Sequence, residues 1–413
     1  MMLYIDPGTG SMLFTILIGV LGAAIYALRN VFMKLRFALS GGKREAVSSN
    51  TIPFVIFTDS KRYWNLFRPI CEEFEKRGEK LVYMTASPDD PALQCQSKNV
   101  ECQFIGEGNR AYAKLNMLSA DVVLSSTPGL DVYQWKRSKD VKFYAHIPHA
   151  AKDLVFYRMF GIEYFDAVLL SGEYQAEQIR QLEAARNLPP KELPLVGQPY
   201  LDEMLKQLQA APPAPDHETT VLLAPSWGPN GILSRFGGKA IKALLDTGHH
   251  VIVRPHPQSF TSEKELMDRL MAEFPDSDQL EWNRDNDNFL VLQRSDILIS
   301  DFSGVLFDFS LVFDKPLIYA DTTFDRSIYD ACWLKEELWT FECLPRLGLQ
   351  MTDENLPDIG KIIEKCIDDP VFRQGRDRAR QETWCHIGEG AERTADYLIE
   401  KRNQLLAADG QAQ

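Results

Sequence analysis

The stretch SDILISDFSGVLFDFSLVF, residues 295–313, contains two apolar segments with a small, polar segment between them. Residues 297–299 form a short apolar run that is typical of a buried strand, and residues 305–313 are apolar at roughly helical spacing. Small and polar residues fill the segment 300–304 between them. In an open parallel sheet, ligands bind beyond the carboxyl ends of the strands, where helix N-termini offer N–H groups to anions. The stretch therefore predicts an α/β fold, with either a phosphate-binding turn or an ordinary helix cap at 300–304.

The same alternation of strands and helices runs through most of the chain. A first series of strands is expected at 52–57, 80–85, 101–105, 120–126, 141–147 and 165–171. A second series is expected at 220–226, 250–257, 280–282, 296–300 and 315–320. The Pro-rich segment 211–215 separates the two series. Strands spaced by helical segments indicate βαβ units, so we expect two doubly wound Rossmann-like domains that face each other across a cleft.

The length of the chain supports more than one domain, since 413 residues exceed what one ordinary core accommodates. The net charge of −13 argues against a general nucleic-acid binder. We expect a membrane anchor with a basic juxtamembrane segment at 1–38 and a linker at 39–51. An N-terminal Rossmann-like domain is expected at 52–205 and a C-terminal one at 206–380, followed by a C-terminal helix at 381–413 that packs across both domains.

The N-terminal region contains an uncharged apolar run at residues 12–28, at the lower edge of the length that spans a bilayer. Asp6 is the only charged residue before this run, whereas Arg29, Lys34 and Arg36 follow it. A cleaved signal peptide has its positive charges before the apolar run, which is the opposite order. We therefore expect a single-pass protein of the inner or plasma membrane whose folded part lies in the cytoplasm.

Two strand ends of the second series carry residues suited to binding phosphate. The loop APSWGPNG, residues 224–231, follows one strand, and Ser226 with its neighbouring N–H groups fits either a phosphate or a simple turn. The motif RPHP, residues 254–257, follows the next strand along the chain. Arg254 offers a fork for phosphate oxygens, and His256 can carry or donate a proton near neutral pH.

The segment AHIPHAAKD, residues 145–153, ends a strand of the first series and supplies two further histidines. Either His146 or His149 could face the cleft as a base opposite the phosphate-binding residues of the second domain. Neither histidine has the spacing of a zinc ligand set, so no metal site is expected.

Taken together, these motifs resemble the CDP-glycerol:poly(glycerophosphate) glycerophosphotransferase family, the membrane-associated enzymes of teichoic-acid-type polymers. The resemblance covers about residues 120–330. It rests on VGQPYLDEM (196–204), APSW (224–227), RPHP (254–257), the stretch 295–313 and KPLIY (315–319). The resemblance implies a GT-B-like fold and transfer of glycerol phosphate from CDP-glycerol to a hydroxyl of a lipid-linked glycan or polymer, with release of CMP. The residues of these motifs require no cofactor. Whether Mg²⁺ accompanies the diphosphate is left open.

The resemblance also implies roles for individual residues. His256 would lie near the donor pyrophosphate, and Ser303 would contact a donor phosphate with Asp301 beside it. The chain has Gly304 where the family often has a second serine, so one hydroxyl contact is missing, although the N–H of Gly304 can approach a phosphate closely. The expected donor-phosphate site therefore comprises Ser226, Arg254, Ser300, Asp301, Ser303 and Gly304.

The first-domain motif departs from the family. The family's proposed base lies in a His-Gly-Thr-Pro-Leu-Lys stretch, whereas residues 146–152 read HIPHAAK. Either His146 or His149 is the counterpart, and Lys152 matches the lysine. These departures leave open whether the donor is CDP-glycerol or a related CDP-polyol.

Two other functions fit parts of the same pattern. A GT-B nucleotide-sugar glycosyltransferase or a UDP-sugar 2-epimerase-like enzyme would share the paired domains, and Glu281 or Asp285 would then contact ribose. A catalytically inactive membrane scaffold would keep the fold without the chemistry, and the altered first-domain motif mildly favours it.

Overall fold

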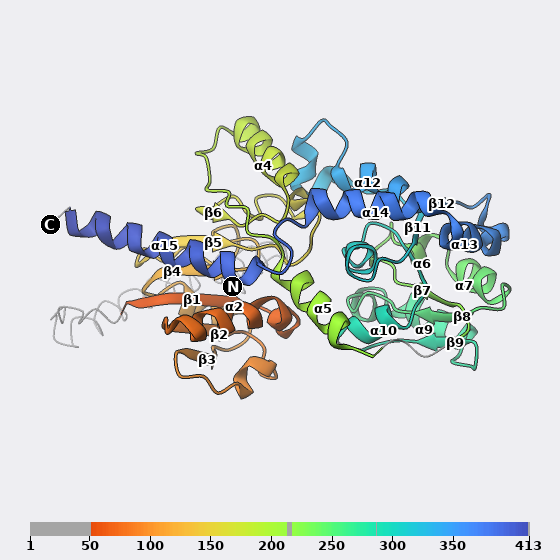
Figure 1. Ribbon diagram of the computed structural model, residues 1–413, viewed down its shortest axis with the longest axis horizontal. Helices are drawn as coiled ribbons and strands as arrows, with labels where there is room; N and C mark the ends of the chain where they lie inside the picture. The colour runs from red at the N-terminus through yellow and green to blue at the C-terminus, as the bar shows by residue number, and fades with distance from the viewer. Residues whose placement is uncertain (1–50, 213–216, 286, 412–413) are drawn as a thin grey trace, which may run out of the picture. The chain divides into compact units, whose positions relative to one another are not determined.

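Two six-stranded parallel sheets organise the chain from Ile52 onward in the computed structural model, which describes residues 51–212, 217–285 and 287–411 (Figure 1). The first sheet has the order β3-β2-β1-β4-β5-β6, and the second has the order β12-β11-β10-β7-β8-β9. Each sheet is therefore doubly wound in the same way, with its first and fourth strands side by side in the middle. This confirms the α/β fold with two doubly wound domains.

The strands of the first sheet are β1 (Ile52–Thr58), β2 (Leu81–Thr85), β3 (Val100–Phe104), β4 (Ala120–Ser125), β5 (Val141–His146) and β6 (Ala167–Val168). Those of the second are β7 (Thr220–Leu223), β8 (His250–Val253), β9 (Leu280–Trp282), β10 (Ile297–Ser300), β11 (Leu317–Ala320) and β12 (Gly348–Met351). All the strands expected from the sequence are present, although β6 is shorter than its apolar run. The edge strand β12 was missed because its short sequence GLQM has no distinct apolar pattern.

The helices of the first domain are α2 (Trp64–Arg77), α3 (Asn109–Leu115), α4 (Glu173–Arg186) and α5 (Pro199–Ala210). Those that follow are α6 (Ile232–Arg235), α7 (Gly238–Leu245), α8 (Ser259–Ser262), α9 (Lys264–Glu273), α10 (Phe289–Gln293), α11 (Val305–Phe307), α12 (Trp339–Leu347), α13 (Ile359–Asp368), α14 (Pro370–Thr383) and α15 (Gly390–Gln411). Helix α11 continues into a π-helical turn, η4 (Asp308–Val312).

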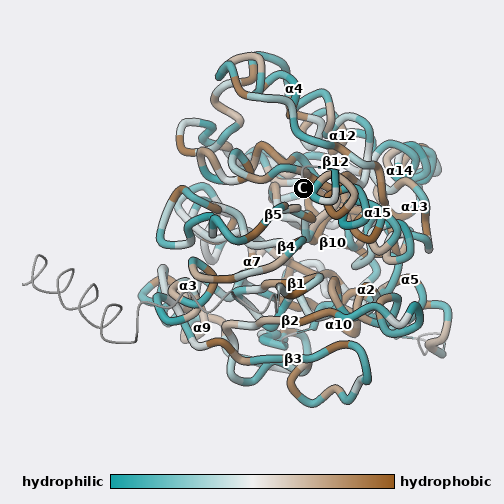
Figure 2. The backbone as a smooth tube through the Cα atoms, turned by 90° about the vertical axis from the view of Figure 1, so that its left-hand side faces the viewer, coloured by the Kyte–Doolittle hydropathy of each residue, from teal (hydrophilic) through white to brown (hydrophobic). Residues whose placement is uncertain are grey.

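Helices cover both faces of each sheet, which explains why the strands read as continuous apolar runs. In β7, Val221 and Leu223 belong to one buried cluster, whereas Leu222 between them belongs to the cluster on the opposite face. The same alternation holds in β10. Figure 2 shows the mixed hydrophobic and hydrophilic colouring of the helices around these sheets, as expected of helices with one buried face.

The C-terminal segment differs from the expectation of one helix at 381–413. Helix α14 ends at Thr383 and packs against α12, and α15 begins at Gly390 and packs against α2 and β4 (Figure 1). The carboxylate of Asp202, in the first turn of α5, lies at the break. It accepts hydrogen bonds from Trp384 Nε1 at 2.8 Å, Gly388 N at 2.8 Å and Gly390 N at 2.9 Å. The segment thus passes from the second domain to the first as two helices.

A second carboxylate joins the two domains next to the cleft. Asp153 follows β5 of the first domain, and its side chain is built into the N-terminus of α12 in the second. It accepts hydrogen bonds from Trp339 N at 3.0 Å, from Thr340 N at 2.8 Å and from the Thr340 hydroxyl. Gln178 of α4 donates to the same carboxylate. These bonds satisfy the first N–H groups of α12 and tie the loop after β5 to the second domain.

The predicted membrane span at 12–28 and the linker at 39–51 fall almost wholly outside the described residues. Within the part of the chain that the structure describes, no helix combines the length and the apolar character that crossing a bilayer requires. The boundaries at 205/206 and 380/381 stay a prediction, with β1–β6 before the first and β7–β12 between the two.

Replacing Asp153 by alanine is expected to lower the free energy of unfolding by about 2 kcal/mol or more, because it removes a helix cap and leaves buried N–H groups unsatisfied. Urea denaturation measures this loss. Asp278→Ala serves as the control, since Asp278 is exposed and its loss is expected to change stability by less than about 0.5 kcal/mol. Equal losses in the two variants would contradict the structural role of Asp153.

Candidate functional site

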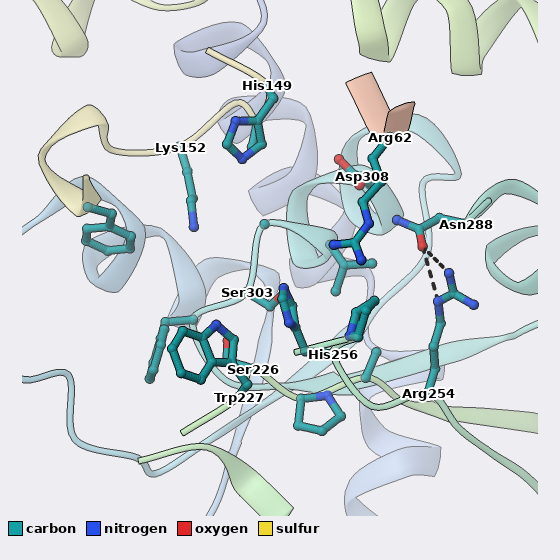
Figure 3. Close-up of a pocket in the computed structure, with 18 of the residues that line it drawn as sticks. Arg62, His149, Lys152, Ser226, Trp227, Arg254, His256, Asn288, Ser303 and Asp308 are labelled. Atoms are coloured by element: carbon teal, nitrogen blue, oxygen red, sulfur yellow. Dashed lines mark hydrogen bonds between the residues drawn. The ribbon is translucent and has the colours of Figure 1, made fainter. Parts of the chain in front are cut away.

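The loops that follow the strands of both sheets enclose a cavity of about 830 Å³ (Figure 3). Its first-domain wall comes from residues 61–66 after β1 and from the loop after β5. Its second-domain wall comes from the loops after β7, β8 and β10. The cavity therefore lies at the switch points of both sheets, where strand order reverses and open α/β sheets bind ligands.

One buried carboxylate shapes the second-domain wall. Asp301, directly after β10, is 1% exposed and accepts hydrogen bonds from Ser226 N at 3.1 and 3.0 Å, Ile232 N at 3.3 Å and Phe302 N at 2.8 Å. Burial raises the pKa of Asp301, and the hydrogen bonds from Ser226 and from the backbone oppose this rise. A Cβ atom at Gly231 would lie 2.3 Å from Ser226 O, so the loop closes this tightly only with glycine.

The expected phosphate-binding residues divide into two groups. Ser226, Ser303 and Gly304 line the cavity. Ser300 and Asp301 do not: the Ser300 hydroxyl is fully buried and donates to Ala224 O at 2.6 Å. These two residues join the ends of β7 and β10 and hold the cavity-lining residues in place. The expectation of direct phosphate contact by Ser300 and Asp301 is therefore not supported by their position.

Arg254 lines the cavity, but its guanidinium is already occupied. It donates to Asn288 Oδ1 from Nε at 3.1 Å and from Nη2 at 2.8 Å, to Asp285 O at 2.7 Å, and to Asn283 Oδ1 (Figure 3). These bonds fold the loop after β9 against the cavity. Arg254 thus positions Asn288 and is not an open fork for phosphate, in contrast to the expectation from the sequence.

His256 lies in the cavity between two prolines. Its Nδ1 accepts a hydrogen bond from Gln258 N at 3.1 Å, so the proton of the neutral ring is assigned to Nε2. Burial lowers the pKa of His256 to about 4, and the nearby cations Arg62 and Lys152 act in the same direction. At neutral pH the ring is therefore an uncharged donor.

The two first-domain histidines have different surroundings. His149 lines the cavity with its ring centroid 4.9 Å from that of Tyr63, and burial lowers its pKa to about 4. His146 is fully buried, bonds Tyr157 Oη through Nε2 at 3.0 Å and does not line the cavity. The ambiguity between them is thus resolved geometrically, because only His149 can reach a ligand in the cavity.

Two cations point into the cavity from the first domain (Figure 3). The Lys152 ammonium lies 5.2 Å from the centroid of the Phe156 ring, and burial lowers its pKa while nearby carboxylates oppose this change. Arg62 enters from the loop after β1. Within residues 51–212, 217–285 and 287–411, neither side chain forms an ion pair, so both charges are available to an anion. Arg62 was missed by sequence reasoning, although the switch-point rule applied to β1 could have pointed to its loop.

Asp308 was also missed as a site residue. It lines the cavity at the start of η4 and is 6% exposed. Burial raises its pKa to about 7, and Lys152 and a hydrogen bond from Asn288 oppose this rise. The signal in the sequence was a single carboxylate within the apolar run of residues 305–313.

The described side chains contain no group of three or more His, Cys, Asp or Glu residues arranged to hold a metal ion. The geometry defines a two-domain α/β protein with a cleft in which uncharged donors at Ser303 and His256 of the second domain face the cations Lys152 and Arg62 of the first. Such a site is suited to a negatively charged ligand of the size of a nucleoside diphosphate ester.

The family model described as CDP-Glycerol:Poly(glycerophosphate) glycerophosphotransferase matches residues 163–332, which confirms the resemblance inferred from the motifs. The matched region contains Ser226, Arg254, His256 and Ser303, whereas His149 precedes it. No curated protein matches the chain.

Solved structures share the fold. They include the S. aureus MnaA–UDP co-structure, with a TM-score of 0.56, 13% identity and coverage of 85% of this chain and 96% of that chain. The UDP-GlcNAc 2-epimerase of Methanocaldococcus jannaschii in complex with UDP-GlcNAc and UDP has a TM-score of 0.54, 12% identity and coverage of 84% and 99%. The UDP-N-acetylglucosamine 2-epimerase of Rickettsia bellii has a TM-score of 0.52, 11% identity and coverage of 86% and 98%. This similarity establishes the GT-B-like architecture.

Replacing Asp301 by asparagine is expected to lower the free energy of unfolding by about 2 kcal/mol, because an amide group would face N–H groups that now donate to a buried carboxylate. Urea denaturation measures the change. Wild-type stability in this variant would show that the hydrogen bonds to Asp301 do not hold the loop.

The uncharged state of His256 is open to direct measurement. Its ring resonances, assigned by comparison with His256→Gln, are expected to keep the chemical shifts of a neutral imidazole from pH 8 down to about pH 5, because its pKa lies near 4. Titration of the ring with a midpoint at or above pH 6.5 would contradict the burial of this side chain.

Proposed function

We propose that this chain transfers glycerol phosphate, or a related polyol phosphate, from CDP-glycerol to a hydroxyl of a membrane-linked acceptor and releases CMP. The observation that supports this proposal is that two kinds of group line the same cavity. Hydrogen-bond donors of the family-matched second domain, at Ser303 and His256, face the cations Lys152 and Arg62 of the first domain.

The donor diphosphate would lie across the N-terminus of the helix after β10. Ser303 and the N–H groups at Gly304 would bind its oxygens, and the protonated Nε2 of His256 would donate to them. Lys152 and Arg62 would offset the charge that builds up on the phosphates and on the departing CMP during in-line attack. Their effect is strengthened because the cavity is partly shielded from water.

The acceptor hydroxyl would approach from the first-domain wall, where His149 lies. This histidine is the counterpart, on this chain, of the first-domain histidine that the family resemblance implies. The uncharged run at 12–28, with basic residues after it, supports an acceptor held in the plasma membrane and a catalytic part on its cytoplasmic side. In this proposal, the acceptor hydroxyl belongs to a lipid-linked glycan or polymer.

A nucleotide-sugar enzyme is the second candidate, since the similar solved structures include UDP-GlcNAc 2-epimerases. The ribose contacts expected for that function are not supported by position. Glu281 pairs with Arg294, and the Asp285 carboxylate accepts from Asn283 at 2.8 Å. Neither Glu281 nor Asp285 lines the cavity. The family match supports the CDP-polyol as the donor in this proposal.

Release of CMP from CDP-glycerol is the direct test, with purified protein in detergent, membrane lipid as the acceptor source, and CDP-ribitol and UDP-GlcNAc offered in parallel. Wild type is expected to release CMP. Ser303→Ala and His256→Ala are expected to lower the rate by about 100-fold, because each removes a donor to the transferring phosphate.

His249→Ala is the matched control, since His249 precedes the opposite end of the strand that leads to His256. It is expected to keep the wild-type rate. Release of UDP alone would move the protein to the nucleotide-sugar candidate. Binding of CMP without turnover of any donor would favour an inactive scaffold.

A further inference from the structure

Asp308 occupies a position that packing does not explain. Its neighbours Phe307 and Phe309 are fully buried in the core of the second domain, whereas the Asp308 carboxylate lines the cavity. It begins the π-helical turn η4, and its N–H donates to Gly304 O at 3.4 Å, within the phosphate-binding turn. Such turns recur at functional sites because they redirect a side chain out of the regular helical register.

The groups facing this carboxylate come from three segments. Lys152 approaches from the loop after β5, Asn288 donates a hydrogen bond from the loop before α10, and the Tyr200 hydroxyl approaches from α5. Burial raises the pKa of Tyr200, so its hydroxyl stays protonated. The cations of α14, which also packs against η4, are used elsewhere: Arg376 pairs with Asp314, and Arg380 donates to Leu311 O at 3.0 Å.

His149 and Asp308 both line the cavity near Lys152, and each can accept a proton at neutral pH. Burial and Lys152 lower the pKa of His149 to about 4, which makes its ring a weak base. Burial raises the pKa of Asp308 to about 7. General-base catalysis is most efficient when the pKa of the base lies near the working pH, which favours the carboxylate.

We propose that Asp308 is the catalytic base that takes the proton of the attacking hydroxyl, and that His149 orients this hydroxyl. The inference rests on the proposed function. The acceptor oxygen forms a bond to the phosphorus that carries the polyol, and the bond from that phosphorus to the oxygen of CMP breaks. CMP leaves with the electron pair of the broken bond, and the hydroxyl proton passes to a carboxylate oxygen of Asp308, next to Lys152.

The dependence of kcat/KM on pH tests this role, with CMP release from CDP-glycerol as the readout. Wild type is expected to gain activity as the pH rises through about 7 and to level off above it, because the base must be deprotonated. Asp308→Asn is expected to lose about 100-fold or more in kcat and to lose this limb of the profile. His149→Gln is expected to be slower but to keep the limb.

Asp246→Asn is the matched control, because Asp246 is an exposed residue paired with Lys242 far from the cavity in sequence and fold. If Asp308→Asn raises KM but keeps kcat and the limb, Asp308 is a binding residue and the inference is overturned. In that case the proposed transfer still stands. If the wild type releases no CMP from any CDP-polyol, the proposed function and this inference both fall.

Thermal unfolding gives a readout that needs no turnover. The unfolded chain releases the Asp308 proton near pH 4, whereas the folded protein holds it to about pH 7. The native state binds this proton more strongly than the unfolded chain does in this window, so the contribution of Asp308 to stability falls as the pH rises through it. Asp308→Asn is expected to show a smaller fall in Tm between pH 5 and pH 7 than the wild type. Identical falls would overturn the protonation on which the inference depends.

Discussion

The arrangement of the cleft depends on the carboxylate of Asp153. This residue follows β5 of the first domain, and its side chain accepts hydrogen bonds from the second domain. Asp153 caps α12 through the backbone N–H groups of Trp339 and Thr340, and it directly follows the cavity residue Lys152. Because the cap satisfies N–H groups that have no partner within the helix, the loop after β5 is held against the second domain. These hydrogen bonds join the loop that carries Lys152 to the second domain.

Desolvation decides the charge states within this cleft. Burial keeps His149 and His256 uncharged and raises the pKa of Asp308, whereas Lys152 and Arg62 supply positive charge. A chain with a net charge of −13 thus presents a locally cationic cavity. Carboxylates that do not line the cavity do the positioning. Asp301 serves in this way by gathering N–H groups from the loops after β7 and β10.

Much of the fold was predictable because both sheets are covered on two faces, so that each central strand appears in the sequence as an uninterrupted apolar run. Ser226, His256, Ser303 and Gly304 were also predictable, since each follows a strand directly and strand ends converge at a known edge. Arg254 was predicted to lie at the cavity, but the hydrogen bonds that occupy its guanidinium were not predicted. Its partners at Asn283 and Asn288 lie about thirty residues further along the chain, and no local pattern signals such a bond.

The sequence by itself determined the order of strands and helices, the two doubly wound domains and the family resemblance, because these depend on local periodicity and short motifs. Only the tertiary structure decided which of His146 and His149 reaches the cavity, that Arg62 and Asp308 belong to the site, and where the C-terminal helix breaks. Each of these depends on contacts between segments distant in the chain. Burial shifts the pKa of a side chain only after such contacts have excluded water from it.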